Sequence, residues 1–305
     1  MLKQRHFLSL SDFSAFDLKT LLATAAEMKK HPKPFRKVLK GQVLALLFER
    51  PAPCLRLGFE VGMGRLGGTA HFLGSEALRG EPGLDTANIL SRYADGIVLR
   101  AHSHQTALDL ASHGTVPVVN GQTDREDPCQ ALADFQTLLE KFGRLEGLRL
   151  TYLGAGSPIA HALLLGTART GMDCTLIVPR GGLSSCLPEL LGQAQAEHAK
   201  QGTRLQLTED LHAARGSHAI YTGPWLPAGQ STETAYPEAL QNLAVTQAVM
   251  ELAGSDAVFM HGLPAHRGRE VAPEVIDGPQ SVVYDQAENR LWTQMAVLYH
   301  LLGGA

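Results

Sequence analysis

Residues 43–62, VLALLFERPAPCLRLGFEVG, decide the fold class, because they predict a short buried strand, a turn and a helix in that order. Residues 43–48 form a continuous apolar run rather than an alternating one, which is typical of a parallel strand buried on both faces. A helix that begins directly after such a strand can bind a phosphate at its first turn. This turn, however, contains prolines and a cysteine where glycines, hydroxyls and arginines are usual, so the stretch is either an anion-binding loop or one that has lost its ligands.

The alternation of strand and helix continues along the whole chain. It predicts an α/β protein of two doubly wound domains, each with a central, mainly parallel sheet flanked by helices. Glycines and charges in the segment 141–150 place the domain boundary near residue 143, which gives domains of 1–143 and 144–287 and a C-terminal helix that returns to the first domain. Strands are predicted at 43–48, 96–100, 116–120, 148–154, 174–179, 204–207, 218–223, 257–263 and 281–285, and helices at 17–29, 86–93, 128–142, 158–170, 189–200 and 288–302.

Composition limits the kind of partner that the protein can have. The 305 residues include 27 basic and 30 acidic side chains, a net charge of -3, which gives no overall attraction to nucleic acid or to an anionic membrane. Any anion site must therefore be local. No apolar run approaches the roughly 20 residues needed to cross a bilayer, the four cysteines have no CxxC spacing and the N-terminus has no signal-peptide pattern, so we expect a cytoplasmic protein with reduced thiols.

Three predicted strand ends carry side chains suited to binding, because ligands of open parallel sheets lie beyond the carboxyl ends of the strands. Arg100 ends one strand, where an arginine commonly holds an anion by forked hydrogen bonds; the alternative is a surface ion pair. Asp127 is predicted to be the N-cap of the next helix, and Gln130 on its first turn could direct an amide into the cleft.

The loop HGLPAHRG, residues 261–268, follows another buried strand. His261 and His266 could act as general acid or base, or they could cap backbone groups. A metal site is not expected here, because the loop lacks a carboxylate or thiolate at ligand spacing. The turn 154–156, GAG, is a weak dinucleotide signal without the third glycine of the fingerprint, so no dinucleotide cofactor is expected.

Five ordered blocks of the sequence form a recognisable set: FERPAPCLRLGFEVG at 48–62, EPGLDTANILSRYADGIVLR at 81–100, VVNGQTDREDPCQALADF at 118–135, HGLPAHRGREV at 261–271 and DGPQSVVYDQAENRLWTQMAVL at 277–298. Together they resemble the aspartate and ornithine carbamoyltransferase family, and most closely its ornithine branch. The resemblance implies a carbamoyl-phosphate domain followed by an amino-acid domain, and homotrimers with active sites between subunits. It implies transfer of a carbamoyl group from carbamoyl phosphate to an amine of an amino acid, without a metal or cofactor.

Four elements of the family's catalytic set match this sequence. Arg100 corresponds to the anion-binding arginine, Gln130 to the glutamine that orients the carbamoyl group and Arg290 to the arginine near the chain end. Leu263, followed by Pro264, corresponds to the loop whose carbonyl accepts from that group. The resemblance makes these the expected catalytic residues.

Both substrate loops depart from the family. Its Ser-Thr-Arg-Thr-Arg phosphate loop is replaced by residues 52–56, APCLR, so that only Arg56 matches, and Asp127 stands where the motif histidine would be. Its Asn-Asn pair is Ser157-Pro158 here, its acceptor-binding aspartate is Gly223 and its cysteine beside the amine is Gly262. We take as candidate substrate-binding residues Arg56, Cys54, Asp127, Ser157, Trp225, His261, His266 and Arg267.

The binding free energy of the lost phosphate contacts favours a changed function. Three or four lost phosphate contacts remove on the order of 5 to 10 kcal/mol, whereas micromolar binding amounts to about 8 kcal/mol. Binding of carbamoyl phosphate or a related anion then needs replacement groups, for which Arg50, Arg65 and Arg125 are nearby candidates. The first hypothesis is a carbamoyltransferase with an altered donor, acceptor or both; the alternative is a non-catalytic paralogue that acts as a partner subunit or ligand sensor.

A third hypothesis makes Cys54 a nucleophile, because the N-terminus of a helix lowers a thiol pKa. The alternative, which we prefer, is that Cys54 is a small buried hydrophobe.

Overall fold

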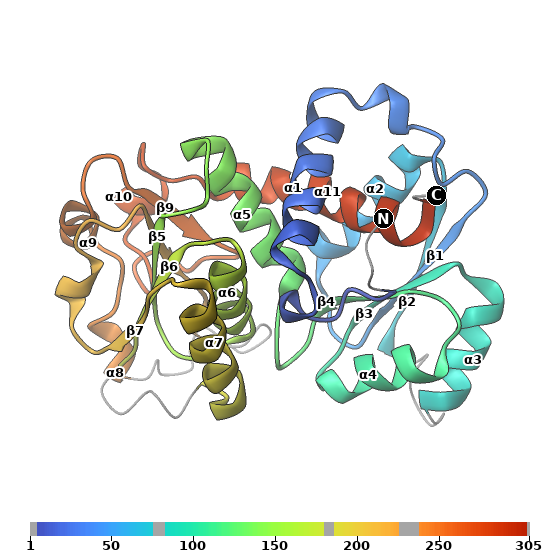
Figure 1. The fold of residues 1–305 in the computed structure, drawn as a ribbon, viewed down its shortest axis with the longest axis horizontal. Helices are drawn as coiled ribbons and strands as arrows, with labels where there is room; N and C mark the ends of the chain where they lie inside the picture. The colour runs from blue at the N-terminus through green and yellow to red at the C-terminus, as the bar shows by residue number, and fades with distance from the viewer. Residues whose placement is uncertain (1–4, 76–82, 180–185, 226–237, 304–305) are drawn as a thin grey trace. The chain divides into compact units, whose positions relative to one another are not determined.

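The computed structural model describes residues 5–75, 83–179, 186–225 and 238–303, and these fall into two compact units. Unit 1 comprises Met1–Gln136 with Glu288–Ala305, and unit 2 comprises Thr137–Ala287. Each unit has a parallel sheet flanked by helices, and the C-terminal helix contributes to unit 1, which confirms the predicted fold class (Figure 1). The domain limits 1–143 and 144–287 remain predictions, since the division between the units falls inside a helix at Gln136 and Thr137.

The sheet of unit 1 has the order β2-β1-β3-β4, and all its strand pairs are parallel. Because the chain runs outward from β1 in one direction to β2 and in the other to β3 and β4, the strand order reverses between β1 and β3. Ligands of such sheets bind at this reversal. The strands are β1 Val43–Phe48, β2 Thr69–Leu73, β3 Gly96–Arg100 and β4 Val118–Gln122, and the helices are α1 Ala15–Lys30, α2 Pro53–Leu66, α3 Gly83–Tyr93, α4 His104–His113, α5 Pro128–Phe142 and α11 Val283–Leu298.

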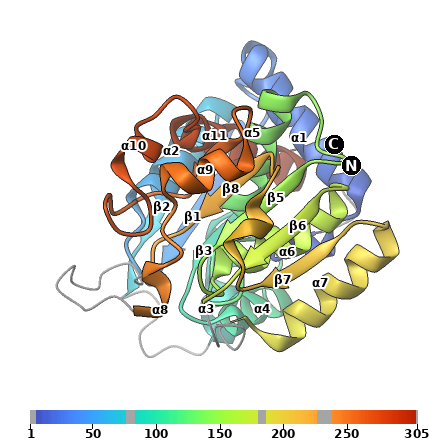
Figure 2. The same cartoon turned by 90° about the vertical axis from the view of Figure 1, so that its left-hand side faces the viewer.

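The sheet of unit 2 has the order β7-β6-β5-β8-β9, again with parallel pairing throughout (Figure 2). Its order reverses between β5 and β8. None of the helices within the described residues is long and apolar enough to cross a membrane. The strands are β5 Arg149–Leu153, β6 Asp173–Ile177, β7 Leu205–Thr208, β8 Ala219–Thr222 and β9 Val258–His261, and the helices are α6 Pro158–Arg169, α7 Pro188–Gln201, α8 Glu238–Gln241, α9 Gln247–Ala253 and α10 Pro273–Ile276.

One predicted strand was wrong, and one strand was not predicted. Residues 281–285 do not form a strand: Ser281 makes an isolated bridge to Phe259, and α11 begins at Val283. The contact with β9 is limited to this bridge, in which the Val282 amide donates to the Phe259 carbonyl at 3.0 Å, because the next residue, Val283, already begins the helix. The missed strand is β2, whose pattern TAHFL is largely exposed because it lies at the edge of its sheet, so it lacks the continuous apolar run of the buried strands.

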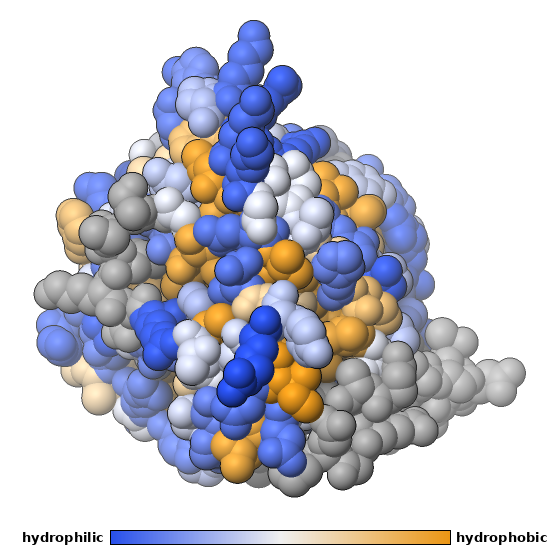
Figure 3. Space-filling view, turned by 90° about the vertical axis from the view of Figure 1, so that its right-hand side faces the viewer, coloured by the Kyte–Doolittle hydropathy of each residue, from blue (hydrophilic) through white to orange (hydrophobic). Residues whose placement is uncertain are grey.

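Helix α2 packs closely on α11 through a glycine. A Cβ placed on Gly58 would lie 2.2 Å from Oε1 of Gln294, and the Gln294 side chain is buried. Hydrophilic and hydrophobic side chains are interspersed on the surface shown in Figure 3. The α2–α11 contact therefore depends on the missing side chain.

We predict that Gly58→Ala destabilises the protein by about 1 to 3 kcal/mol, because overpacking forces a buried side chain out of its place. The matched control is Gly64→Ala on the exposed part of the same helix, where nothing lies within 4 Å of the added Cβ. That change should stabilise by about 0.5 to 1 kcal/mol through helix propensity. Urea denaturation of both variants measures the two effects, and equal shifts would contradict the packing argument.

Candidate functional site

The ends of β1, β3 and β4 meet at the point of unit 1 where the strand order reverses. Phe48 pairs with Arg100 in register, and the next residue, Glu49, donates its amide to the Arg100 carbonyl at 2.8 Å. Ala101 donates to the Gln122 carbonyl at 3.1 Å, which joins the end of β3 to that of β4. The loops after these three strands are therefore held side by side and can line one site.

Arginines gather at this place. Burial lowers the pKa of the Arg100 guanidinium; the carboxylate of Asp127 acts to raise it, and the positive charges of Arg50 and Arg290 lower it further. Nε of Arg50 and Nε of Arg100 are buried without a hydrogen-bond partner among the described residues. Three guanidinium groups thus share one neighbourhood with one carboxylate, which leaves positive charge and unused donors for an anion.

Asp127 and Gln130 are both held by the helix that they begin. Oδ1 of Asp127 accepts the amide of Gln130 at 3.1 Å, which confirms the predicted N-cap of α5, and Oδ2 accepts Nε2 of Gln122 at 3.1 Å. Burial raises the pKa of Asp127, although its hydrogen bond from Gln130 and the charges of Arg290 and Arg100 oppose this. The buried Gln130 donates Nε2 to Oδ1 of Asp134 at 2.7 Å, so this donor is used inside α5.

The first turn of α2 offers few ligands for a phosphate. Ala52 is the N-cap and Pro53, at the first helical position, has no amide hydrogen to donate. Cys54 is exposed, so the expectation of a small buried hydrophobe at this position was wrong; Leu55 is the buried residue, because it occupies the inward face of the first turn. The turn therefore presents an exposed thiol to solvent.

Arg56 is the one residue that matches the family's phosphate loop, and its side chain is engaged by two neighbours in unit 1. Its Nε donates to Oε1 of Glu60 at 2.8 Å, and its guanidinium lies 3.9 Å from the centre of the Phe72 ring. It borders a groove of about 540 Å³ beside the turn. Arg50 also lines this groove, and the lining residues are 48–53, Arg56, Leu57, Glu60, Phe72, Gly74 and Ser75.

The other arginines proposed as replacements lie elsewhere in unit 1. Arg65 places its guanidinium 5.0 Å from the centre of the Trp292 ring, and Nε of Arg125 lies 3.8 Å from Oε1 of Glu126. Arg50 is therefore the candidate that the structure brings to Arg100.

In unit 2, the loop after β9 is organised by a buried carboxylate, Glu270. Its Oε1 accepts the amide of His266 at 2.6 Å and lies 3.3 Å from Nδ1 of His266 and 3.6 Å from Nε2 of His261. Burial acts to raise the pKa of Glu270, but the interactions with His261 and the His266 amide outweigh it, and the pKa is lowered. Sequence reasoning did not single out Glu270, although it lies in the block HGLPAHRGREV, because its burial and its contacts with both histidines arise only from the fold.

Leu263 has an unusual backbone within this loop. Its φ of 47° is in the left-handed region, which a leucine rarely adopts, and its amide donates to Nδ1 of the buried His261 at 2.9 Å. Conformations of this kind gather at functional sites. Arg267 instead makes a two-pronged ion pair with Asp277 on an exposed surface, with Nη2 and Oδ1 2.6 Å apart.

Ser157 and Trp225 lie at the ends of β5 and β8. The Ser157 hydroxyl caps α6 by accepting the Ala160 amide and lies 3.0 Å from the Tyr152 hydroxyl. Burial raises the pKa of Tyr152 to about 12, so that hydroxyl keeps its proton. Trp225 and Leu263 pack against the apolar core of the unit, and Gly223 adds no side chain.

Comparison with known proteins places both units in one family. Residues 5–140 match the model "Aspartate/ornithine carbamoyltransferase, carbamoyl-P binding domain", and residues 146–301 match the corresponding "Asp/Orn binding domain". The ornithine carbamoyltransferase of Thermococcus kodakarensis is 42% identical over 98% of this chain and 97% of its own, and that of Halalkalibacterium halodurans is 44% identical over 99% and 97%. The solved ornithine carbamoyltransferase of Pyrococcus furiosus superposes with a TM-score of 0.93 at 39% identity, covering 98% of this chain and 97% of that one.

Proposed function

Because this chain belongs to the aspartate/ornithine carbamoyltransferase family, we propose that it is a transferase of that family whose anionic donor is bound by Arg50, Arg100 and Arg290. The observation that carries the proposal is the pair of buried, unpartnered Nε groups of Arg50 and Arg100 within the described part of unit 1. Such donors are costly to bury unless a ligand uses them. Carbamoyl phosphate or a related acyl phosphate supplies acceptor oxygens and the matching charge.

The proposed chemistry follows from that charge. An amine attacks the carbonyl carbon of the donor, the bond to the phosphate oxygen breaks, and the phosphate leaves with the electron pair while the amine loses a proton. Negative charge grows on the leaving group, and fixed guanidinium groups in a partly buried site stabilise it. The first turn of α2 contributes less to phosphate binding than the phosphate-loop motif of the family would, because Pro53 has no amide hydrogen to donate.

The acceptor is proposed to differ from ornithine. At the ends of β5, β8 and β9, unit 2 presents Ser157, Gly223 and Gly262 where the family motif has amides, a carboxylate and a thiol. Trp225 and Leu263 add apolar surface there. An amine without a free α-amino and α-carboxylate pair fits these groups better than an amino acid does. We further propose a homotrimer in the cytoplasm, as the family resemblance implies.

A second candidate function is a non-catalytic paralogue that acts as a partner subunit or a ligand sensor. The observation that favours it is Asp127, whose carboxylate lies close enough to Arg100 and Arg290 to interact with both. The Asp127 carboxylate neutralises part of the positive charge that would otherwise attract an anionic carbamoyl donor. Arg56, the remaining arginine of the phosphate loop, is also committed to Glu60.

Titration calorimetry with carbamoyl phosphate, acetyl phosphate and sulfate tests the proposal. We expect heat with at least one of the two acyl phosphates, followed by phosphate release when a panel of alkylamines and amino acids is added. Absence of heat and of turnover with every donor contradicts a transferase. In that case, mixed oligomers formed with an active ornithine carbamoyltransferase would support the second function.

A further inference from the structure

Two residues of α5, Gln130 and Asp134, form a hydrogen-bonded pair in the interior of unit 1. Nε2 of Gln130 donates to Oδ1 of Asp134 at 2.7 Å, and the two residues are 4% and 0% exposed. Amide and carboxylate groups lose their hydration on burial, which is costly unless they are hydrogen-bonded. An apolar pair would fill the same space at a lower desolvation cost, which indicates that these polar groups serve a purpose beyond packing.

The chain contains a second pair of the same kind at the surface. On α4, Nε2 of Gln105 donates to Oδ1 of Asp109 at 2.8 Å, again across four residues, and this hydrogen bond is exposed. Pairs at this spacing stabilise a helix slightly wherever they occur. Water can replace Asp109 as the acceptor for Gln105, whereas it has little access to the buried pair. Burial therefore makes Asp134 the residue that fixes the orientation of the Gln130 amide.

The hydrogen bond to Asp134 also determines which end of that amide is left for a ligand. An ionised carboxyl group accepts hydrogen bonds and cannot donate them, so it selects the nitrogen end of the amide. No hydrogen bond to Oε1 of Gln130 comes from the described part of the chain. The group that remains is an acceptor oxygen held in one orientation.

Gln130 adjoins the arginine cluster, as we call Arg50, Arg100 and Arg290. Oδ1 of Asp127 accepts the Gln130 amide at 3.1 Å. The charges of Arg290 and Arg100 act on the pKa of the same Asp127 carboxyl group. The first turn of α5 therefore lies within electrostatic range of the groups proposed to bind the donor.

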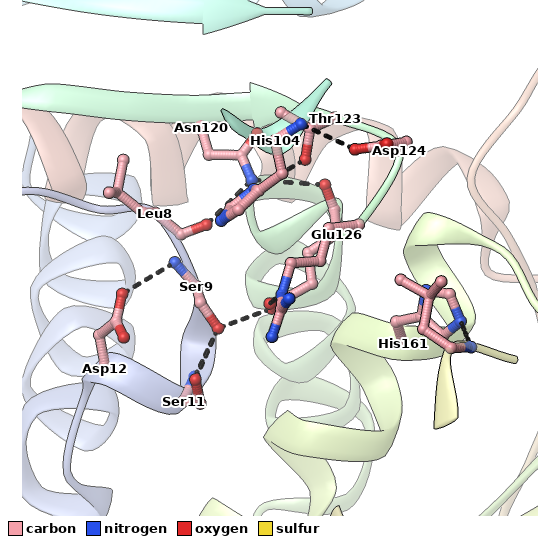
Figure 4. A network of polar contacts seen from close by, with 12 residues as sticks. Leu8, Ser9, Ser11, Asp12, His104, Asn120, Thr123, Asp124, Glu126 and His161 are labelled. Atoms are coloured by element: carbon pink, nitrogen blue, oxygen red, sulfur yellow. Dashed lines mark hydrogen bonds and ion pairs between the residues drawn. The ribbon is translucent and has the colours of Figure 1, made fainter. Parts of the chain in front are cut away.

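The loop before α5 is attached to its neighbours, so the start of the helix is held in place (Figure 4). Oε2 of the buried Glu126 accepts the Ser9 hydroxyl at 2.9 Å, and the Thr123 amide donates to the Glu126 carbonyl at 3.1 Å. With the backbone held by these contacts, the orientation of the Gln130 amide is the remaining variable. Asp134 controls it, as a supporting side chain does in a preorganised site.

We propose that Asp134 is a positioning residue for the donor: it holds the Gln130 amide so that Oε1 accepts an N–H of the acyl group. The inference rests on the proposed function and narrows its substrate class. A carbamoyl group offers an N–H to this acceptor, whereas an acetyl group of the same shape offers only a methyl. Through Gln130, Asp134 thus makes the site prefer carbamoyl phosphate to acetyl phosphate.

Titration calorimetry with these two acyl phosphates measures the preference. Asp134→Leu removes the acceptor at a similar volume, so the Gln130 nitrogen loses its buried partner whenever Oε1 accepts from the donor. We expect about a tenfold loss of affinity for carbamoyl phosphate and less than about a twofold change for acetyl phosphate. Asp109→Leu, in the exposed pair, is the matched control and should leave both affinities unchanged.

A double-mutant cycle with Gln130→Met shows whether Asp134 acts through Gln130. Gln130→Met lacks the amide, so adding Asp134→Leu to it should cause no further loss of preference. Equal losses for the two donors in Asp134→Leu, or the same loss of preference with and without the Gln130 amide, would overturn the proposal.

Asp134→Asn keeps the test decisive if Asp134→Leu does not fold. The asparagine preserves the shape but offers a donor as well as an acceptor, so the Gln130 amide can pair in either orientation. The preference for carbamoyl phosphate should then fall by about twofold, because two orientations share the population. An unchanged preference in this variant contradicts the proposal.

Protein stability separates this inference from the proposed function. Urea denaturation of Asp134→Leu, Gln130→Met and the double variant measures the coupling of the two residues without any donor. We expect a coupling of about fivefold in the unfolding constant. If neither acyl phosphate binds the unmodified protein while this coupling is present, the proposed function fails together with the role toward the donor, and the hold of Asp134 on Gln130 stands. Absence of coupling overturns the inference itself.

Discussion

Arg100→Gln is expected to weaken binding of a phosphate-type donor by about 10- to 100-fold. Arg100 ends β3 beside Arg50 and Asp127, and its Nε has no hydrogen-bond partner in the described part of the chain. A hydrogen bond to a charged group contributes about 1.5 to 3 kcal/mol, and 1.4 kcal/mol corresponds to a tenfold change in affinity. Partial burial strengthens the charge interaction further.

Calorimetry with the donor that gives heat measures the loss. The control is Arg267→Gln, because Arg267 is exposed and already paired with Asp277 through two hydrogen bonds. Its affinity should match that of the unmodified protein. Arg100→Gln should not reduce stability greatly, since it removes a charge that two neighbouring arginines repel. If Arg100→Gln retains full affinity, the arginine cluster is not the donor site.

Glu270→Ala is expected to destabilise the protein by about 3 kcal/mol. The carboxylate is buried, accepts the His266 amide at 2.6 Å and lies 3.6 Å from Nε2 of His261. Its removal leaves the His266 amide without this acceptor and opens a cavity. Urea denaturation measures the loss. Glu274→Ala is the control, because Glu274 is exposed on the neighbouring helix α10. It should change stability by less than about 0.5 kcal/mol.

The pH dependence of this loss identifies its cause. The pKa of Glu270 is lowered in the folded protein, so its contribution is fully present above the usual value of 4.5 and is lost as pH falls through the folded value. The difference between the unmodified protein and Glu270→Ala should therefore shrink in acid. Glu270→Gln, which keeps the shape but cannot ionise, should show a smaller loss at neutral pH. A difference between the unmodified protein and Glu270→Ala that is constant at every pH would indicate packing alone.

The sequence alone determined the family, the fold class and most strands. Continuous apolar runs such as residues 43–48 and 96–100 identify buried parallel strands, because both faces of these sheets are covered by helices. Edge strand β2 was missed because it is largely exposed and lacks an apolar run, and the start of α11 was predicted to be a strand because residues 281–285 contain a short apolar run. The substitutions at residues 52–55 were also visible, because each residue occupies a fixed place in the motif.

Only the tertiary structure shows which charged side chains lie together and which of them are buried. Arg50, Arg100 and Asp127 follow β1, end β3 and follow β4, and the pairing of these strands brings them together. Arg290 comes from α11, near the C-terminal end of the chain, and still lies close enough to interact with Arg100 and Asp127. The burial of Glu126 and Glu270 was likewise invisible in a list of residues. From sequence alone, a carboxylate is expected to lie at the surface. The pKa of a carboxyl group depends on the elements that exclude water from it, and these are known only from the fold.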